Sequence, residues 1–399
     1  MAAAPVAAKR GASLLALVLV VLTGLVGFGL FIPIFPFLAL HLGATATETT
    51  IAMGAYSLGQ LIASPGWGRL SDIVGRKPVL IIGLAGGAVS YIMLAYATSV
   101  EAMGLARLFG GLMAGNVGAA FAAATDLADD STRARNMGFL GAAFAVAFIV
   151  GPALGALLVG PDATLQGYQR VCFAAAGFAT LAVAFAAFFF TETLPREARR
   201  SATAPRVRRM ALLQSRPLLA RLVAITLVMI SAQALMESTF ALWADRELSW
   251  GAHETGWAFA ALGVLTILLQ GGGAGRIART LGEARMLALG LIVFACGLIG
   301  LALAQAQWSA YAALSVLAVG VGLATPALNA LVGGQAREDD RGAVMGLNQS
   351  ASALGRVIGP LSAGALFDGL GHTAPFAIGA ILLAGALALA LTAKRDEPI

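Results

Sequence analysis

Charged side chains are scarce in this chain. Asp, Glu, Lys and Arg together make up 12% of its 399 residues, whereas soluble globular proteins carry about 25%. Hydrophobic residues make up 59%, and the mean hydropathy is +0.85. So few polar side chains cannot cover a surface that faces water. The composition therefore excludes a soluble globular protein and predicts an all-α membrane protein, because helices satisfy their own backbone groups in lipid.

Cysteine and histidine are also rare. The two cysteines, Cys172 and Cys296, both lie in apolar runs, which excludes a disulfide framework. The three histidines, His41, His253 and His372, are scattered next to loop residues, so they form no metal-ligand pattern. The chain has no phosphate-binding loop of the type Gly-x-x-x-x-Gly-Lys-Ser/Thr. We therefore expect no metal, no cofactor, no built-in ATP motor and no enzyme.

Long apolar runs dominate the sequence, and its 49 glycines fall inside these runs rather than between them. Small residues let membrane-spanning helices approach closely. A span needs roughly 20 apolar residues, and charged and turn residues divide the chain into twelve such segments. The expected spans are 13–40, 49–69, 78–98, 102–124, 136–159, 169–190, 220–243, 254–275, 286–304, 309–332, 343–367 and 373–393.

The first apolar run needs separate treatment. It extends from Gly11 to about Leu40, which is too long for the apolar part of a cleaved signal peptide, the alternative interpretation. We take it as the first span. Pro33 and Pro36 are expected to kink its outer end without dividing it.

The long polar stretch after the sixth span divides the chain near its middle. It is dense in arginine and contains Pro195, Pro205 and Pro217. We expect an N-terminal six-helix bundle over residues 1–194, a cytoplasmic linker over 195–219 and a C-terminal six-helix bundle over 220–399.

The distribution of basic residues predicts the orientation. With the N-terminus in the cytoplasm, all but four of the 26 lysines and arginines fall in segments on the inner side. Arg170 and Arg246 lie in outer segments, and Arg107 and Arg356 lie in spans. Because cytoplasmic loops carry the excess of Lys and Arg, we expect an inner-membrane protein with both termini cytoplasmic. The pI of about 9.8 then needs no nucleic-acid partner.

Two sequence repeats indicate that the halves are duplicated. Gly68-Arg-Leu-Ser-Asp-Ile-Val-Gly follows the second span, and Gly275-Arg-Ile-Ala-Arg-Thr-Leu-Gly follows the eighth. Both have the pattern Gly-Arg-x-x-charged-x-x-Gly. A Gly-Pro pair also recurs, at Gly151 in span five and Gly359 in span eleven. Duplicated halves are typical of secondary transporters.

At this point the sequence resembles the major facilitator superfamily over essentially its whole length, and within it the drug/proton antiporters that include the tetracycline exporters. Gly68-Arg-Leu-Ser-Asp-Ile-Val-Gly-Arg-Lys-Pro resembles the signature loop between helices two and three, and Arg107-Leu-Phe-Gly-Gly the buried-arginine motif. Gly151-Pro-Ala-Leu-Gly resembles the helix-five motif of exporters, and Gly27-x-Gly-x-x-x-Pro33-x-x-Pro36 the first-helix motif. The resemblance implies the major facilitator fold and export of a small molecule.

The expected gating residues fall in two places. At the inner end, we expect Asp72 to pair with Arg76 and Lys77, and Gly68 and Gly75 to allow a tight turn; the alternative is a basic loop placed only for topology. Asp126 is expected to pair with Arg76 or Arg69. In span five, Gly151, Pro152 and Gly155 bend the helix and bare one face for close packing that closes the outer side, and the alternative is a kink with no gating role.

Three charged residues within spans are the candidates for proton coupling: Arg107, Glu237 and Arg356. An arginine exposed to lipid costs several kcal/mol, so Arg107 is expected to face a cavity or a partner, unless its side chain reaches the outer interface. Glu237 shares a helical face with Gln233, and a carboxylate in an apolar span favours binding a proton. Arg356 is expected to pair with Glu237; the alternative is a static ion pair.

Several polar and aromatic residues in spans are candidates for lining a substrate cavity, and each of them has the alternative of packing against a neighbouring helix. They are Phe28, Phe31, Tyr56, Gln60, Asn116, Gln233, Asn329, Asn348 and Gln349.

The chain departs from the tetracycline exporters at three positions. Those proteins carry an acidic residue in helix one, a histidine in helix eight and an aspartate in helix nine, where this chain has Gly24, Thr266 and Phe294. Their machinery for a tetracycline–metal chelate therefore does not carry over.

The expected function is a monomeric secondary transporter that exports amphipathic small molecules in exchange for protons, with the lipid bilayer, the substrate and protons as its partners. The runner-up is a proton-coupled carrier of a metabolite such as a sugar or organic acid, which would need more paired polar groups in its spans. A membrane enzyme or a non-transporting receptor is the third interpretation.

Overall fold

The computed structural model describes residues 3–129, 132–161, 164–194, 209–269, 274–337 and 340–393. Over these ranges the secondary structure consists of helices joined by short turns, without strands. The helices are α1 (Ala3–Phe31), α2 (Phe35–His41), α3 (Ala46–Val74), α4 (Arg76–Ala95), α5 (Val100–Leu112), α6 (Asn116–Asp126), α7 (Arg133–Val159), α8 (Leu165–Phe188), α9 (Arg209–Ser215), α10 (Pro217–Leu248), α11 (Ala252–Leu268), α12 (Ala274–Leu281), α13 (Glu283–Leu303), α14 (Gln307–Gly334), α15 (Arg341–Leu370) and α16 (Ala374–Ala393).

The helical spans are at the predicted places. Nine helical segments within the described residues are long and apolar enough to cross a membrane, counting α1 with α2 and α5 with α6 as one span each. Three more helices, α3, α11 and α15, lie at the expected second, eighth and eleventh spans. These three helices are not counted among the nine because α3 and α15 carry more polar residues and α11 is described over only 17 residues. The predicted fold, twelve membrane helices in two six-helix bundles, is confirmed.

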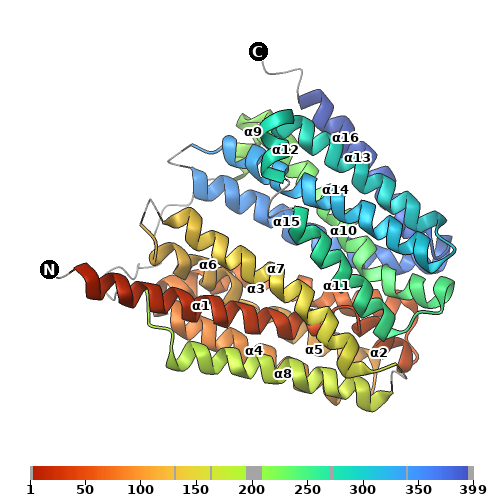
Figure 1. The fold of residues 1–399 in the computed structure, drawn as a ribbon, viewed down its shortest axis with the longest axis horizontal. Coiled ribbons are helices and arrows are strands. Elements are labelled where there is room, and N and C mark those ends of the chain that lie inside the picture. Colours follow the sequence, from red (N-terminus) through yellow and green to blue (C-terminus); the bar gives the residue numbers. More distant parts are fainter. Residues whose placement is uncertain are drawn as a thin grey trace. The chain divides into compact units, whose positions relative to one another are not determined.

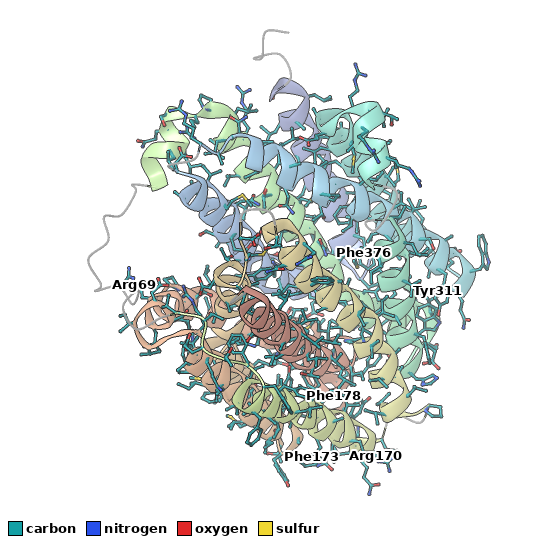
Figure 2. The ribbon with its side chains drawn as sticks, turned by 60° about the vertical axis from the view of Figure 1, so that its left-hand side comes forward. Arg69, Arg170, Phe173, Phe178, Tyr311 and Phe376 are labelled. Carbon is teal, nitrogen blue, oxygen red and sulfur yellow. The ribbon has the colours of Figure 1, made fainter. Side chains whose placement is uncertain are left out.

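The first compact unit comprises Met1–Gly43, Ala55–Ala204 and Ala252–Ala260. Within it α1 packs against α7 and α8, and α8 packs against α4 (Figure 1). Its core joins four helices through fully buried apolar side chains: Leu17 of α1, Leu80 of α4, Ala123 of α6 and Leu140 of α7. Exposed Arg69 and Arg170, expected on opposite sides of the membrane, lie at opposite ends of this unit (Figure 2).

The second compact unit comprises Ala44–Gly54, Pro205–Gly251 and Ala261–Ile399. In it α10 packs against α15 and α16, and α13 packs against α14 and α16. Trp243 of α10 meets Phe376 of α16 edge to face, with ring centroids 5.6 Å apart. The first turns of α3 belong to this unit because the Thr47 N–H and hydroxyl donate to Asp368 Oδ2 of α15 at 2.9 and 2.6 Å.

The first apolar run is divided, contrary to our expectation of a kink in one helix. Helix α1 ends at Phe31, and a turn separates it from α2, which begins at Phe35. Pro33 and Pro36 have no N–H to donate to the carbonyls one turn earlier, so the helical hydrogen bonding is interrupted twice within four residues. The fourth span is also interrupted, at residues 113–115 between α5 and α6.

The sequence repeat is also a structural repeat. Gly75 ends the loop motif of the first half with φ of +109° and precedes α4 directly, and Gly282 ends the motif of the second half with φ of +76° and precedes α13 directly. A side chain is strained at such positive φ angles, whereas glycine adopts them freely. The two glycines therefore make the same turn between consecutive helices in each half.

Candidate functional site

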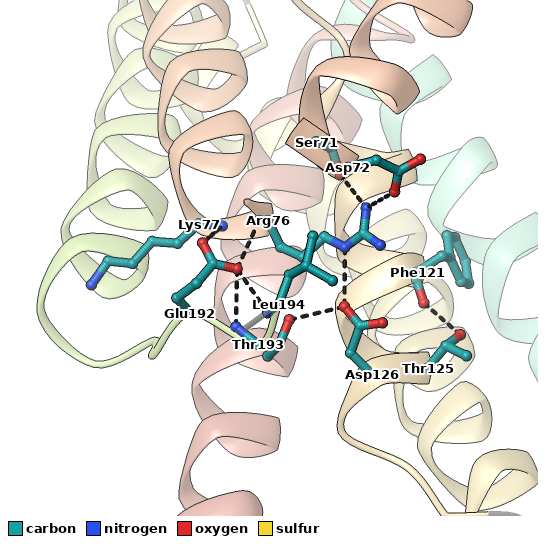
Figure 3. Close-up of polar contacts among 10 residues, drawn as sticks. All are labelled: Ser71, Asp72, Arg76, Lys77, Phe121, Thr125, Asp126, Glu192, Thr193 and Leu194. Atoms are coloured by element: carbon teal, nitrogen blue, oxygen red, sulfur yellow. Dashed lines mark hydrogen bonds and ion pairs between the residues drawn. The ribbon is translucent and has the colours of Figure 1, made fainter. Parts of the chain in front are cut away.

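A cluster of charged residues gathers at one end of the first unit around Arg76, the first residue of α4 (Figure 3). Its Nη1 donates to Asp72 Oδ1 at 2.7 Å and to the Ser71 hydroxyl at 2.6 Å, both in the last turn of α3. Its Nε donates to Asp126 Oδ2, at the end of α6, at 3.0 Å. The predicted contacts of Arg76 with Asp72 and Asp126 are present, and the Arg76 side chain is only 10% exposed. Screening by salt is weaker for such a buried group than at an open surface.

Glu192, which follows α8, completes this cluster and was not among the predicted residues. Its carboxylate accepts hydrogen bonds from the backbone N–H groups of Arg76 at 2.8 Å and Lys77 at 3.1 Å (Figure 3). The first N–H groups of a helix lack intrahelical partners, and Gly75, the N-cap residue of α4, has no side chain to offer them. The one available signal was an acidic residue standing just before an arginine-rich segment. The charged cluster thus joins α3, α4, α6 and the end of α8.

Two of the expectations for the inner end are wrong: the pairing of Lys77 with Asp72 and the tight turn at Gly68. The ammonium of Lys77 donates to the carbonyl of Ala187 at 2.7 Å rather than pairing with Asp72, because Lys77 faces α8 while Asp72 lies on α3. Gly68 makes no tight turn, because it lies inside α3, and a Cβ placed on it would meet nothing within 4 Å. Gly75 alone makes the turn.

The glycines of span five pack directly against α1. A Cβ on Gly151 would lie 2.7 Å from the backbone of Gly29, and a Cβ on Gly155 would lie 2.4 Å from the carbonyl oxygen of Leu30. Pro152 lies between them inside α7, which continues from Arg133 to Val159. Helix α7 therefore has the expected face without side chains, and the backbone of α1 packs against that face.

The carboxylate of Glu237 lies in α10, where its neighbours Met236, Ser238 and Thr239 are buried. Gln233, one turn earlier, donates from Nε2 to Glu237 Oε1 at 2.8 Å. This confirms that the two side chains share a face. Arg356 of α15 is exposed, and no ion pair joins it to Glu237 among the residues that the structure describes, so the expected pair is not formed here.

Arg107 of α5 is only 8% exposed and is surrounded by aromatic rings. Its guanidinium carbon lies 4.5 Å from the ring centroid of Tyr56, and 5.6 to 5.9 Å from those of Phe28, Phe31 and Phe35. The structure thus brings three of the predicted cavity residues, Phe28, Phe31 and Tyr56, to one charged group. Phe35 was not among the predictions.

The remaining polar candidates are dispersed. In the second unit, Thr226 donates to Asn348 Oδ1 at 2.6 Å, and Asn348 donates to Asn329 Oδ1 at 3.2 Å. These bonds connect α10, α15 and α14. Asn116 begins α6 and packs against Gly83, Gln60 is half-buried on α3, and Gln349 is exposed on α15.

Trp67 is a further residue that sequence reasoning missed. Its indole N–H donates to the carbonyl of Leu112 at 2.6 Å, where α5 ends. A Cβ on Gly115 would lie 2.2 Å from the indole ring. Trp67 of α3 therefore covers the break between α5 and α6 and satisfies one of the carbonyls freed there.

Two of the three positions that depart from the tetracycline exporters, Gly24 and Phe294, lie at contacts between helices. A Cβ on Gly24 would lie 2.9 Å from Cδ2 of Leu84 in α4, so a larger residue there would displace the end of that side chain. Phe294 is fully buried against the backbone at Gly320 of α14. The hydroxyl of Thr266 donates to Leu262 of its own helix at 2.8 Å.

Comparisons with known proteins agree with this architecture. The family model described as Major Facilitator Superfamily matches residues 17–246 and 222–399. The chain is 31% identical to the class G tetracycline resistance protein of Vibrio anguillarum, over 90% of this chain and 91% of that protein. It is 28% identical to the quinolone resistance protein NorA of Staphylococcus aureus, over 86% of each chain.

A solved structure has the same fold. The human organic anion transporter MFSD10 superimposes with a TM-score of 0.72 at 24% identity, over 96% of this chain and 99% of the other. Matches of this extent point to a transporter of the membrane and not to an enzyme. Since the family model spans both halves of the sequence, the chain belongs to the Major Facilitator Superfamily.

Proposed function

We propose that this protein is a proton-coupled exporter of amphipathic small molecules. Two kinds of support converge on this function. Relatives named for resistance to tetracycline and to quinolones align over nearly the whole chain. The spans also hold very few charges, so a transported proton has few groups to bind.

The observation that carries the proton coupling is the place of Glu237. It is a carboxylate on the otherwise uncharged middle of α10, with a neutral amide, Gln233, as its hydrogen-bond partner at 2.8 Å. A charged carboxylate in such surroundings is costly, and binding a proton removes the cost. The protonated and deprotonated forms therefore favour different surroundings, which is the differential affinity that shifts a two-state equilibrium.

Arg107 and Arg356 complete the proposed coupling set. Both are cations within spans, and a change in their distance from Glu237 during transport would change the cost of its charge. Arg356 is exposed on α15, so its guanidinium is available for a partner that changes between states.

The charged cluster around Arg76 and the glycine face of α7 are the proposed gating elements. Asp72 is 51% exposed whereas Arg76 is 10% exposed, so the Asp72–Arg76 bond is the more accessible of the contacts and the more easily broken. Gly151 and Gly155 allow α7 to slide on α1 without side chains that interlock.

We also propose that the protein acts as a monomer in the inner membrane with both termini cytoplasmic, and that residues 1–194 and 220–399 are its two bundles, joined by the linker 195–219. The distribution of lysine and arginine supports the orientation. Most of the linker lies outside the described residues.

The test uses inside-out membrane vesicles that carry an imposed proton gradient and a dye that reports it. Addition of a transported drug or dye should release protons through the wild-type protein, and Glu237→Gln should abolish this release. Glu247→Gln, on the outer end of the same helix and 2.7 Å from His372, serves as the matched control and should behave as wild type. Proton release that is unchanged in Glu237→Gln, or absent from wild type across a broad drug panel, would refute the proposal.

A further inference from the structure

The aromatic cage around Arg107 is composed of Phe28, Phe31, Phe35 and Tyr56. These side chains come from α1, α2 and α3 and enclose a guanidinium on α5. Phe31 and Phe35 are each 1% exposed and form the floor of the cage. Phe28 and Tyr56 are half-buried, so they are the more accessible members of the cage.

The charge of Arg107 lacks a counter-ion within the described part of the chain. None of the described carboxylates pairs with it, and its Nε is buried with no hydrogen-bond partner. Aromatic faces attract a cation, at about 0.5 to 2 kcal/mol for each good contact. They do not accept the in-plane N–H donors of a guanidinium, which has five of them. The cage therefore holds the cation in place and leaves its Nε donor without a hydrogen bond.

We propose that Arg107 and its aromatic cage form a binding subsite for the carboxylate of an aromatic organic acid. A carboxylate matches the planar fork of a guanidinium with two parallel hydrogen bonds. It would also supply the missing negative charge. The half-buried ring of Phe28, whose centroid lies 5.7 Å from the guanidinium carbon, provides an aromatic contact for the body of such a ligand.

This subsite narrows the cargo of the proposed exporter to amphipathic anions and rests on that proposed function. A cationic ligand of the same shape is disfavoured, because it would bring a second positive charge to a buried and unpaired one. A neutral ligand gains the stacking but not the ion pair. The order of affinity is therefore anion, then neutral, then cation.

The test measures equilibrium binding to the purified full-length protein in lipid nanodiscs, with three ligands of one shape. The anion is 2-naphthoate, the neutral analogue is 2-naphthalenemethanol, and the cation is 2-naphthylmethylammonium. Wild type should bind naphthoate most tightly. Arg107→Gln should weaken naphthoate about tenfold or more, as expected for the loss of a charge-assisted bidentate contact, while the binding of the neutral analogue stays within about threefold.

The Arg107→Lys variant distinguishes carboxylate binding by Arg107 from a purely structural role of this residue. It keeps the charge but loses the fork, so naphthoate affinity should fall between those of wild type and Arg107→Gln. Equal weakening of all three ligands in both variants, or no preference of wild type for the anion, would overturn the proposal. Equilibrium binding needs no proton gradient, so Glu237→Gln should still bind naphthoate. A loss of proton coupling alone is thereby distinguished from a failure of this subsite.

Discussion

At the scale of single residues, Glu192 shows how one side chain can hold two helix ends together. Its carboxylate accepts the backbone N–H groups of Arg76 and Lys77 at the start of α4, and it follows the end of α8. An anion at this position satisfies free donors and also interacts favourably with the positive end of the helix dipole. Glu192 thus acts on the backbone that carries Arg76 and not on its side chain.

Replacement of Glu192 should therefore lower stability. We expect Glu192→Ala to cost about 1 kcal/mol, the usual cost of losing a helix cap, and to lower the Tm of the purified protein measured by tryptophan fluorescence. Glu283→Ala is the matched control. Exposed Glu283 begins α13 directly after Gly282, as Arg76 begins α4 directly after Gly75, and it has no described side-chain contact. Equal losses in the two variants would mean that charge near a helix start, and not the cap, is what matters.

Only some side-chain pairs were predictable from the sequence: the expected pairs of Asp72 with Lys77 and of Glu237 with Arg356 are not formed among the residues described. Asp72 and Arg76 are four residues apart, and opposite charges at a helix end predict a contact, so Asp72–Arg76 was expected and is present. The partner of Arg107 was not predictable, because it is a set of ring faces from three helices. Glu192 was missed because it binds backbone N–H groups, which nearly every residue has. The sequence of α4 therefore gives no sign of which side chain caps the helix.

At the scale of helices, the contact between α1 and α7 depends on having no side chain at two positions. A Cβ at Gly151 or Gly155 would lie 2.7 or 2.4 Å from backbone atoms of α1. Backbone cannot move aside as a flexible side chain can, so any larger residue must separate the two helices. The crossing is recreated in the second unit, where Gly359 of α15 approaches the backbone of α10.

Gly151→Ala should accordingly destabilise the protein, by about 1 to 3 kcal/mol as for other overpacked interiors. Gly141→Ala, on the same helix, is the control: a Cβ there meets nothing within 4 Å, and the better helix propensity of alanine should add about 0.5 to 1 kcal/mol. Thermal unfolding in one detergent compares the two variants. Shifts of the same sign for both would exclude close packing as the cause.

The starts of α10 and α15 are joined by a buried ion pair outside the spans. The Arg216 guanidinium donates to Asp340 and to the carbonyl of Gln335, the latter at 2.9 Å. The backbone N–H of Arg337 donates to the other Asp340 oxygen at 2.9 Å. The hydrogen bond from Arg216, followed by that from the Arg337 backbone, lowers the pKa of Asp340 below its usual value.

This lowered pKa predicts a stability that depends on pH. The ionised carboxylate stabilises the folded state above the unfolded-state pKa of about 3.9, and the contribution is lost as pH falls through the folded-state pKa. The Tm difference between wild type and Asp340→Asn should stay constant from about pH 7 to about pH 5 and shrink below about pH 4. Arg216→Gln should show the same convergence. A difference that persists unchanged to about pH 3 would contradict this role of the pair.

Helix positions followed from the sequence more closely than helix continuity did. The predicted span 136–159 and the observed α7 (Arg133–Val159) nearly coincide, because the length of an apolar run can be counted in the sequence. The division of the first run between Phe31 and Phe35 was missed. Pro152 lies inside an unbroken helix, whereas Pro33 and Pro36 lie at a break, so proline alone does not decide between the two outcomes.

At the scale of the whole molecule, the two halves share a turn but not a charge pattern. Gly75 and Gly282 make the same positive-φ turn. Asp72, Arg76 and Asp126 surround that turn in the first half, whereas Arg279 takes the place of Asp72 in the second and donates to its own helix at Gly275. Within the described residues, the turn is therefore shared by both halves, while the ion-paired cluster around it is found in the first half.

The distribution of basic residues predicts the direction in which the molecule lies in the membrane, and two of these residues can test the prediction. Arg69 and Arg170 are exposed and lie at opposite ends of the first unit (Figure 2). Single cysteines, Arg69→Cys and Arg170→Cys, are placed in a background of Cys172→Ala and Cys296→Ala, which removes both native thiols. In intact spheroplasts a membrane-impermeant maleimide should label position 170 and not position 69, because cytoplasmic loops carry the excess of Lys and Arg. After permeabilisation both positions should react, which shows that position 69 is protected by the bilayer and not by the fold. The reverse pattern would invert the orientation, and with it the direction of proton-driven export.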